Sequence, residues 1–368
     1  MKSLQDARTR VGSWLFDSAL PLWAERGVDP QGRFYELLQF DGQPVTGGVR
    51  RTRVQARQVY AFAQAAALGF APGRAIAQAG LDGMIRTCRR PDGLWVLSTD
   101  AEGAVVDDTP DLYDEAFCLF ALAAGHRVLG DARCLPLALQ TLDAIDTVMA
   151  APHGGWAEAV PARLPRRQNP HMHLLEAMLA WHAVSPHPRF EATAREVLRL
   201  FDTAWFHELS GTLGEFFTED WTPAEGRAGE LVEPGHHFEW VWLLSEARKN
   251  GWIDAEAKAM RLYDHANTLG LNAGGFAVRE ITRDGATALP EWRLWSETEA
   301  VRAHLTVGDE ARALAMLDAI FATHLDTAVP GLWIDSYDGA GVQIDKTVPA
   351  SSLYHLMTAI TALLESGE

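Results

Sequence analysis

Cysteine is scarce in this 368-residue sequence, and positive charge is outnumbered by negative charge. The three cysteines, Cys88, Cys118 and Cys134, are an odd number and lie within or beside apolar helical segments. We therefore expect reduced packing residues in a reducing compartment. Lysine and arginine total 32 against 49 acidic residues, a formal net charge of −17. Nucleic acids and anionic membranes need clustered positive charge, so neither is an expected partner.

Long apolar runs and several common motifs are also missing. No run reaches the roughly 18 apolar residues of a membrane span, and residues 1–10 carry no apolar leader core. The serine-nucleophile pattern Gly-x-Ser-x-Gly and the phosphate-binding patterns Gly-x-x-x-x-Gly-Lys and Gly-x-Gly-x-x-Gly are absent. A hydrophobic content of 48% is nevertheless ample for a core. We expect a soluble, cytoplasmic globular protein, monomer or homodimer, that uses no cofactor.

A small motif, glycine followed shortly by an aromatic residue, recurs six times. Its aromatic residues stand 57 to 61 positions apart, at 34, 95, 156, 216, 276 and 333. Turn signals such as Asp41-Gly42, Asp284-Gly285 and Asp338-Gly339 follow several copies, which predicts short β-hairpins or wide loops. Six copies in nearly constant phase indicate a repeat architecture.

Between these motifs the apolar spacing of three and four residues predicts twelve helices, two in each repeat. The expected spans are 3–25, 50–68, 73–88, 111–128, 131–147, 170–184, 189–206, 235–250, 253–269, 291–306, 309–324 and 350–365. Short and long connections alternate, so neighbouring helices pair as antiparallel hairpins. The pattern predicts an all-α (α/α)6 barrel in one domain, residues 1–368, with an open solenoid as the alternative.

The long loops lead into every second helix, and in five of these six a proline stands where the first helical residue should be. These prolines are Pro110, Pro170, Pro234, Pro290 and Pro349. If the repeats are alike, six helix N-termini and six long loops gather at one end of the barrel. We expect the functional site at that end, because binding residues concentrate on loops held by a rigid scaffold.

Polar and aromatic residues concentrate within two turns of these helix starts. Three histidines, His173, His236 and His355, occur there at comparable depth in three repeats. An imidazole titrates near neutral pH and can therefore move protons on a bound organic molecule. The alternative for any one of them is packing in the helical core, which we expect for His237. The candidate substrate-binding residues at the same ends are Arg57, Tyr113, Asn169, Glu239, Trp295 and Glu299.

Local spacing suggests partners for two of these histidines. Glu239 and Glu176 stand three residues after His236 and His173, where a carboxylate can orient an imidazole. Asn169 is expected to cap its helix. His171 and His173 could suggest a metal site. Residues two apart on a helix point to nearly opposite sides, however, so these two histidines cannot readily bind one ion. No metal is expected.

At these residues the sequence resembles the N-acylglucosamine 2-epimerase family, which includes cellobiose 2-epimerases, mannose isomerases and sulfoquinovose isomerases. The resemblance covers most of the chain and rests on five motifs in order: Arg57-Gln58-Val59-Tyr60, Asn169-x-x-x-His173, Pro234-Gly235-His236-x-x-Glu239, Trp295-x-x-x-Glu299 and Tyr354-His355. It implies an (α/α)6 barrel and metal-free chemistry beside the carbonyl of a reducing sugar. It also implies that His236 and His355 transfer protons, while His173, Arg57 and Glu239 assist ring opening and polarisation.

The stretches 169–173 and 349–355 resemble the mannose isomerase branch. The expected reaction is therefore conversion of a monosaccharide, D-mannose and also D-lyxose, to its ketose. The open alternatives are a 2-epimerase on glucose, N-acetylglucosamine or cellobiose-type sugars, and a sulfoquinovose isomerase. Trp295-Ser296-Glu297 departs from the family pattern, which commonly has Pro-Gln after the tryptophan. Candidates for binding an anionic C6 group, or else solvated loop charges, are Arg50, Arg51, Arg53, Arg163, Arg166 and Arg167.

A third class of function is a glycan-binding or glycan-cleaving (α/α)6 protein. Cleavage would need paired acidic residues flanking a glycosidic bond, and Asp111 and Asp114 are the candidates.

Overall fold

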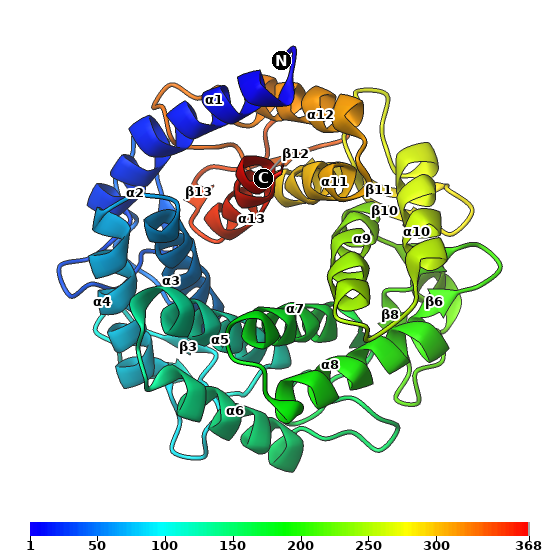
Figure 1. Ribbon diagram of the computed structural model, residues 1–368, viewed down its shortest axis with the longest axis horizontal. Coiled ribbons are helices and arrows are strands. Elements are labelled where there is room, and N and C mark those ends of the chain that lie inside the picture. The colour runs from blue at the N-terminus through cyan, green and yellow to red at the C-terminus, as the bar shows by residue number, and fades with distance from the viewer. Residues whose placement is uncertain (367–368) are drawn as a thin grey trace.

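The computed structural model describes residues 1–366 and arranges the chain as two concentric rings of helices (Figure 1). The inner ring consists of α3 (Thr52–Ala67), α5 (Leu112–Ala124), α7 (Asn169–Val184), α9 (Pro234–Lys249), α11 (Leu294–Val307) and α13 (Ser352–Glu365). The outer ring consists of α1 (Leu4–Trp14) with α2 (Leu20–Arg26), α4 (Pro72–Cys88), α6 (Cys134–Val148), α8 (Pro188–Leu200), α10 (Glu256–Leu269) and α12 (Glu310–Thr323). The last inner helix, α13, packs against the first, α3, and α1 packs against α12. The ring is therefore closed, which confirms the predicted (α/α)6 barrel over the open solenoid.

Short π-helical turns continue three of the predicted helices. They are η1 (Leu15–Ala19), which joins α1 to α2, η2 (Gly125–Leu129) and η3 (Phe201–Trp205). Tight turns then connect each inner helix to the next outer one, and two of them use glycine in the left-handed region. Gly130 has a φ of 72° and Gly308 a φ of 79°, the conformation that commonly ends a helix.

Inner and outer helices differ in how their surfaces are buried. In α5 every residue except Tyr113 is buried, because other helices surround it. In α8, buried residues alternate with exposed ones at helical spacing, as an outer helix with one solvent face requires. Within residues 1–366 no helix combines the length and the apolar character needed to cross a membrane.

The recurring glycine–aromatic motif ties each loop to an inner helix. In the first two copies the Phe34 N–H donates to Gln55 Oε1 over 2.9 Å, and the Trp95 N–H donates to Glu115 Oε1 over 2.8 Å. The equivalent acceptors in the next three repeats are His171 for Trp156, His237 for Leu213 and Glu297 for Ala277. In five inner helices, the side chain at one position of the first turn thus accepts a hydrogen bond from the loop and does not line the cavity. His171 and His237 occupy this position, which explains why they are structural.

Short antiparallel strands join the long loops into a collar at one end of the barrel. The strands are β1 (Leu37–Leu38), β2 (Arg50–Arg51), β3 (Ser98–Thr99), β4 (Val105–Asp107), β5 (Arg166–Arg167), β6 (Phe206–His207), β7 (Thr212–Leu213), β8 (Phe216–Phe217), β9 (Leu231–Val232), β10 (Val278–Thr282), β11 (Thr287–Arg293), β12 (Ser336–Tyr337) and β13 (Val348–Pro349). They pair in the orders β1-β13, β12-β11-β10-β9, β2-β3-β4, β5-β8 and β6-β7. The β10–β11 hairpin turns at the predicted Asp284-Gly285. The β1–β13 pair links the first loop to the last, so the collar closes with the barrel.

The proline prediction was wrong for three of the five helices. Pro290 lies within β11 and Pro349 within β13, because strand pairing continues to the edge of the helix. Pro110 precedes α5, whose N-cap is Asp111. Only Pro170 and Pro234 stand in the first turn of a helix. A proline fits an edge strand such as β13 and also the irregular register of β11 around Pro290, so the prolines indicated the loop end of the barrel without indicating the helix start.

Candidate active site

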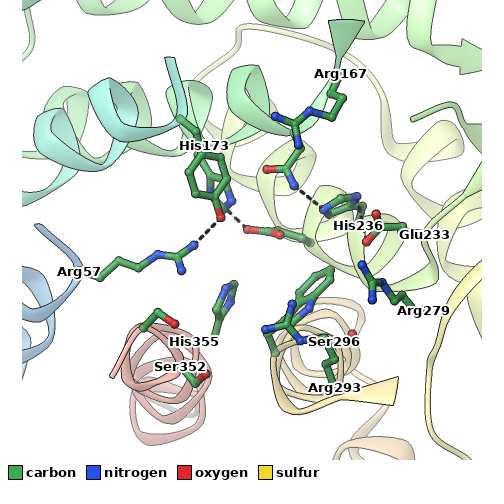
Figure 2. Close-up of a pocket in the computed structure, with 15 residues that line it drawn as sticks. Arg57, Arg167, His173, Glu233, His236, Arg279, Arg293, Ser296, Ser352 and His355 are labelled. Carbon is green, nitrogen blue, oxygen red and sulfur yellow. Dashed lines mark hydrogen bonds and ion pairs between the residues drawn. The ribbon is translucent and has the colours of Figure 1, made fainter. Parts of the chain in front are cut away.

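A cavity of about 270 Å³ opens where the collar meets the inner ring, and all six inner helices contribute to its wall. Its lining consists of Arg57, Tyr113, Arg167, Asn169, His173, Glu233, His236, Glu239, Arg279, Arg293, Trp295, Ser296, Ser351, Ser352 and His355. Eight of the nine residues singled out in the sequence are among them. Figure 2 shows His173, His236 and His355 pointing from three different helices toward the same space. Of the nine residues singled out in the sequence, Glu299 is the one that does not line the cavity.

His355 carries its carboxylate partner behind it. Its Nδ1 lies 2.8 Å from Glu299 Oε1, and Glu299 is fully buried. Glu299 was expected to contact substrate, and the structure corrects this: the glutamate lies one layer deeper and holds the imidazole. Burial and the nearby Arg57 guanidinium lower the pKa of His355 well below its usual value. His355 is therefore neutral, and with Nδ1–H donating to Glu299, Nε2 keeps a lone pair that can act as a base.

His236 has the opposite electrostatic environment. Its Nδ1 lies 3.0 Å from Glu215 Oε2 and 3.9 Å from Glu233 Oε2. Burial disfavours the charged imidazole, but the Glu215 and Glu233 carboxylates outweigh it and raise the pKa of His236 to about 10. His236 is thus an imidazolium at neutral pH and a potential proton donor.

Glu239 was expected to orient His236, and this prediction was wrong. Helical side chains tilt toward the N-terminus of their helix, so His236, in the first turn of α9, points away from the helix body and meets the loop that carries Glu215. Glu215 was missed because it stands 21 residues before His236. A signal was present, since Gly214-Glu215-Phe216 is one of the six glycine–aromatic motifs.

Two amide side chains complete the surroundings of His236. Gln168 donates from Nε2 to Glu215 Oε2 over 3.1 Å and accepts from Trp240 Nε1 over 2.9 Å, which fixes the carboxylate. Asn169 places Nδ2 3.0 Å from His236 Nε2, while its buried Oδ1 has no hydrogen-bond partner within residues 1–366. Turning this amide over would let Oδ1 accept from a protonated Nε2. Asn169 is the first residue of α7 and does not cap it as expected.

His173 and Glu239 lie between the two proton-transfer candidates. His173 Nδ1 lies 3.3 Å from Glu176 Oε2, the partner predicted from their spacing, and 3.7 Å from Glu239 Oε1. Burial lowers the pKa of His173 despite the nearby Glu176 carboxylate. Burial and the neighbouring Glu299 and Glu176 raise the pKa of Glu239 well above its usual value. Neither Glu239 oxygen has a hydrogen-bond partner among the described residues, so a protonated carboxyl group faces the cavity.

Arg57, Tyr113 and Trp295 supply a cation and aromatic walls. Arg57 donates from Nη2 to the Tyr113 hydroxyl over 2.5 Å, and its guanidinium lies 4.1 Å from the centroid of the Phe117 ring. It forms no ion pair with a carboxylate in the described part of the chain, so its charge is available to a ligand. The Trp295 ring lies 5.2 Å from the imidazole of His236 and 5.7 Å from that of His355. The tryptophan ring therefore contacts both the charged and the neutral histidine.

The six arginines named in the sequence as candidates for binding an anionic C6 group already have partners within the protein. Of the six, only Arg167 lines the cavity, and it pairs with Glu158 over 2.7 Å. The acidic residues considered for glycan cleavage are also occupied: Asp114 pairs with Arg53 over 2.7 Å and Asp111 with Arg163 over 3.6 Å. Neither aspartate lines the cavity, so they cannot flank a bond bound there.

Two groups of acidic residues and histidine lie close enough to share a metal ion: His173 with Glu176 and Glu239, and Glu215 with Glu233 and His236. A metal requires an unprotonated imidazole nitrogen, whereas the carboxylates around His236 raise its pKa to about 10. In both groups the histidine Nδ1 already faces a glutamate. The expectation of metal-free chemistry remains a prediction.

Comparison with known proteins places the chain among sugar-converting enzymes. Residues 32–359 match the family model described as N-acylglucosamine 2-epimerase (GlcNAc 2-epimerase). A protein of Rhizobium meliloti (strain 1021) named mannose-6-phosphate isomerase is 37% identical over 374 residues, covering 96% of this chain and 95% of the relative. A D-mannose isomerase of Thermobifida fusca is 28% identical over 342 residues, covering 83% and 80%.

Solved structures share the fold at low sequence identity. The cellobiose 2-epimerase from Bacillus thermoamylovorans B4167 superposes with a TM-score of 0.88 at 20% identity, covering 98% of this chain and 99% of its own. A D-mannose isomerase structure gives a TM-score of 0.85 at 22% identity, covering 98% and 97%. The extent of the family match and the 37% identity together show that this chain belongs to the N-acylglucosamine 2-epimerase family of sugar epimerases and isomerases.

Proposed function

We propose that the protein is an aldose–ketose isomerase that converts D-mannose to D-fructose, and D-lyxose to D-xylulose, without a metal. The observation that carries the proposal is the pair of histidines on either side of Trp295, one neutral and one charged. Titratable groups whose pKa values are driven apart by their surroundings provide a base and an acid in one site. The two relatives, one named mannose-6-phosphate isomerase and the other D-mannose isomerase, support an isomerase that acts on a mannose-type sugar.

Ring opening comes first, because the closed hemiacetal has no free carbonyl. It needs a base at the anomeric hydroxyl and an acid at the ring oxygen. His173, neutral and backed by Glu176, is the proposed base. Glu239, whose pKa is raised by burial, is the proposed acid, and the proton that His173 gains can return to the Glu239 carboxylate, whose Oε1 lies 3.7 Å from His173 Nδ1.

Proton transfer between carbons follows in the open chain. His355 Nε2 removes the proton from C2, and the electron pair passes to the carbonyl oxygen to give a cis-enediolate. Arg57 stabilises the oxygen that gains charge, because its guanidinium has no carboxylate partner to neutralise it. His355 then returns its proton to C1. His236 gives a proton to O1 and recovers the one that leaves O2, so the ketose forms with no net change in the enzyme.

A 2-epimerase is the second candidate, and a specific observation favours it. His236 is charged and lies across Trp295 from His355, where a second acid could deliver a proton to the opposite face of C2. The same intermediate would then give the C2 epimer in place of the ketose. The isomerase names of the two relatives and the resemblance of residues 349–355 to the mannose isomerase branch support the isomerase as the first candidate.

The pairing of three cavity arginines with carboxylates supports an uncharged sugar over its phosphate or sulfonate. Arg167, Arg279 and Arg293 line the cavity, and each already faces a carboxylate: Glu158, Glu291 and Asp335 respectively. A phosphate on C6 would have to compete with these partners.

Incubation with a panel of sugars in heavy water, followed by NMR of the products, tests the proposal. The panel is D-mannose, D-lyxose, D-glucose, N-acetylglucosamine, cellobiose, sulfoquinovose and mannose 6-phosphate. We expect fructose from mannose in the presence of EDTA, with deuterium at C1 to the extent that the abstracted proton exchanges. A C2-deuterated epimer without ketose would replace the isomerase by the epimerase, and conversion of mannose 6-phosphate alone would overturn the choice of an uncharged sugar.

A further inference from the structure

Arg302 connects two of the candidate catalytic histidines beneath the cavity. Its Nη2 lies 3.4 Å from Glu176 Oε1, and its Nη1 lies 3.2 Å from Glu299 Oε2. Each glutamate uses its other oxygen for a histidine: Glu176 Oε2 lies 3.3 Å from His173 Nδ1, and Glu299 Oε1 lies 2.8 Å from His355 Nδ1. The five side chains form one chain of contacts, His173–Glu176–Arg302–Glu299–His355, across three inner helices.

The Arg302 side chain is buried. Arg302 is 4% exposed, and its Cζ lies 3.5 Å from the centroid of the Trp242 ring. On the face away from the active site it borders a second cavity of about 320 Å³, which Trp242, Tyr60 and Phe120 also line. Arg302 therefore lines the second cavity and reaches the active-site histidines only through Glu176 and Glu299.

Removing this one cation would leave an excess of buried acid. Glu176, Glu239 and Glu299 come from α7, α9 and α11 and are almost fully buried, and the Tyr354 hydroxyl of α13 hydrogen-bonds Glu176 from the fourth side. The other cation near this cluster, Arg57 of α3, is turned toward Tyr113. Uncompensated buried carboxylates take up protons, and a protonated Glu299 would be a weaker, uncharged acceptor for the His355 Nδ1–H.

We propose that Arg302 is a positioning residue, which contacts both Glu176 and Glu299 and so holds His173 and His355 in register, with His355 oriented as the base. This inference rests on the proposed function for the role of His355 but not for the geometry. It predicts that Arg302 acts on catalysis and on the state of both histidines without touching the sugar.

The test compares R302M and R302K with wild type, using R33M as the matched control. Arg33 is also buried and ion-paired, with Asp29 at 3.2 Å, but lies outside the cavity lining. We expect R302M to lower kcat about 10- to 100-fold with little change in KM, as loss of an orienting partner typically does. Loss of a positive charge favours proton uptake, so the acidic limb of its pH profile moves to higher pH. R302K restores the charge and the position of that limb but not the full rate. An R302M enzyme with the kcat and pH profile of R33M would overturn the proposal.

A second readout requires neither substrate nor the proposed reaction. In nitrogen-15 NMR, the imidazole resonances of His355 and His173 in folded R302M should be shifted from their wild-type positions, because the carboxylate partner of each histidine loses the cation that holds it, whereas R33M should leave both unchanged. If R302M does not fold, R302K carries the test: His355 shifted from its wild-type resonance supports the inference, and an unshifted His355 contradicts it. If wild type converts no sugar at all, the proposed function fails, while these resonances still decide the role of Arg302.

Discussion

His236 Nδ1 and Glu215 Oε2 lie 3.0 Å apart, although the two residues belong to different structural elements. The glutamate comes from a loop of the collar and the histidine from the first turn of α9. Neighbouring Gln168 holds the carboxylate in place. This contact, with Glu233 nearby, is what separates the charge state of His236 from that of His355 and gives the cavity both an acid and a base.

The substitution E215Q should move the basic limb of the rate profile to lower pH. The carboxylates of Glu215 and Glu233 raise the pKa of His236 to about 10 against the opposing effect of burial, so the acid stays protonated until the pH passes that value. Without the Glu215 charge, His236 loses its proton at lower pH. Measurement of kcat/KM from pH 6 to 10 checks this. E219Q, which removes an exposed carboxylate from the same loop, is the control and should keep the wild-type profile.

The substitution H355A should reduce kcat by about 10²- to 10⁴-fold, the usual contribution of a general base. His355 is the proposed base at C2, and no other neutral imidazole is assigned to that position. H182A is the control, because His182 packs against Trp252 away from the cavity. Wild-type turnover by H355A, measured by product NMR, would remove His355 from the mechanism.

Two adjacent histidines should respond in opposite ways to substitution. His237 Nε2 accepts from the Leu213 N–H over 3.0 Å, so H237A should lower the free energy of unfolding by about 1–3 kcal/mol, the cost of an unsatisfied buried donor. Its kcat should stay near wild type. H236A should show the reverse, a large loss of rate with a smaller loss of stability. Denaturant unfolding and initial rates, measured on the same preparations, separate the two. Equal losses in both variants would contradict the assignment of His237 to the fold.

His171 should make the fold sensitive to acid. Burial and nearby Arg166 lower its pKa to about 3, against an unfolded value near 6.5. A histidine with a lowered folded pKa favours unfolding as pH falls below its unfolded pKa, so this loss grows between pH 6.5 and about 3. At pH 5 it amounts to about 2 kcal/mol, from 1.36 kcal/mol per pH unit. H171Q keeps an acceptor for the Trp156 N–H but cannot titrate. Its unfolding free energy should therefore change less between pH 7 and pH 5 than that of wild type, and an equal change would exclude His171 as the cause.

Treatment with EDTA followed by gel filtration should leave the rate unchanged. The proposed acid, base and cation are all side chains, so no step depends on a divalent ion. Loss of activity that Mn²⁺ or Zn²⁺ restores would contradict metal-free chemistry and direct attention to His173, Glu176 and Glu239.

The barrel and most of the cavity lining were predictable from the sequence because both depend on local, repeated signals. The glycine–aromatic phase located the loops, and helix starts such as those of His173 and His236 indicated which residues share one end. Contacts between elements far apart in the sequence have no such signal. Glu215 reaches His236 from another element, and Arg302 lies in a later, mostly apolar turn of α11 that gave no reason to expect a charged network. Glu299 was located correctly but in the wrong layer, since helical spacing gives direction and not depth.

The most direct test of the account is to observe the protonation of His236 and His355 separately. Nitrogen-15 NMR of the imidazoles, assigned with H236A and H355A, should show His236 as an imidazolium at pH 8 and His355 neutral at pH 6, because the carboxylates near His236 raise its pKa and burial lowers that of His355. Two histidines that titrate together near pH 6.5 would contradict the division into acid and base on which the mechanism rests.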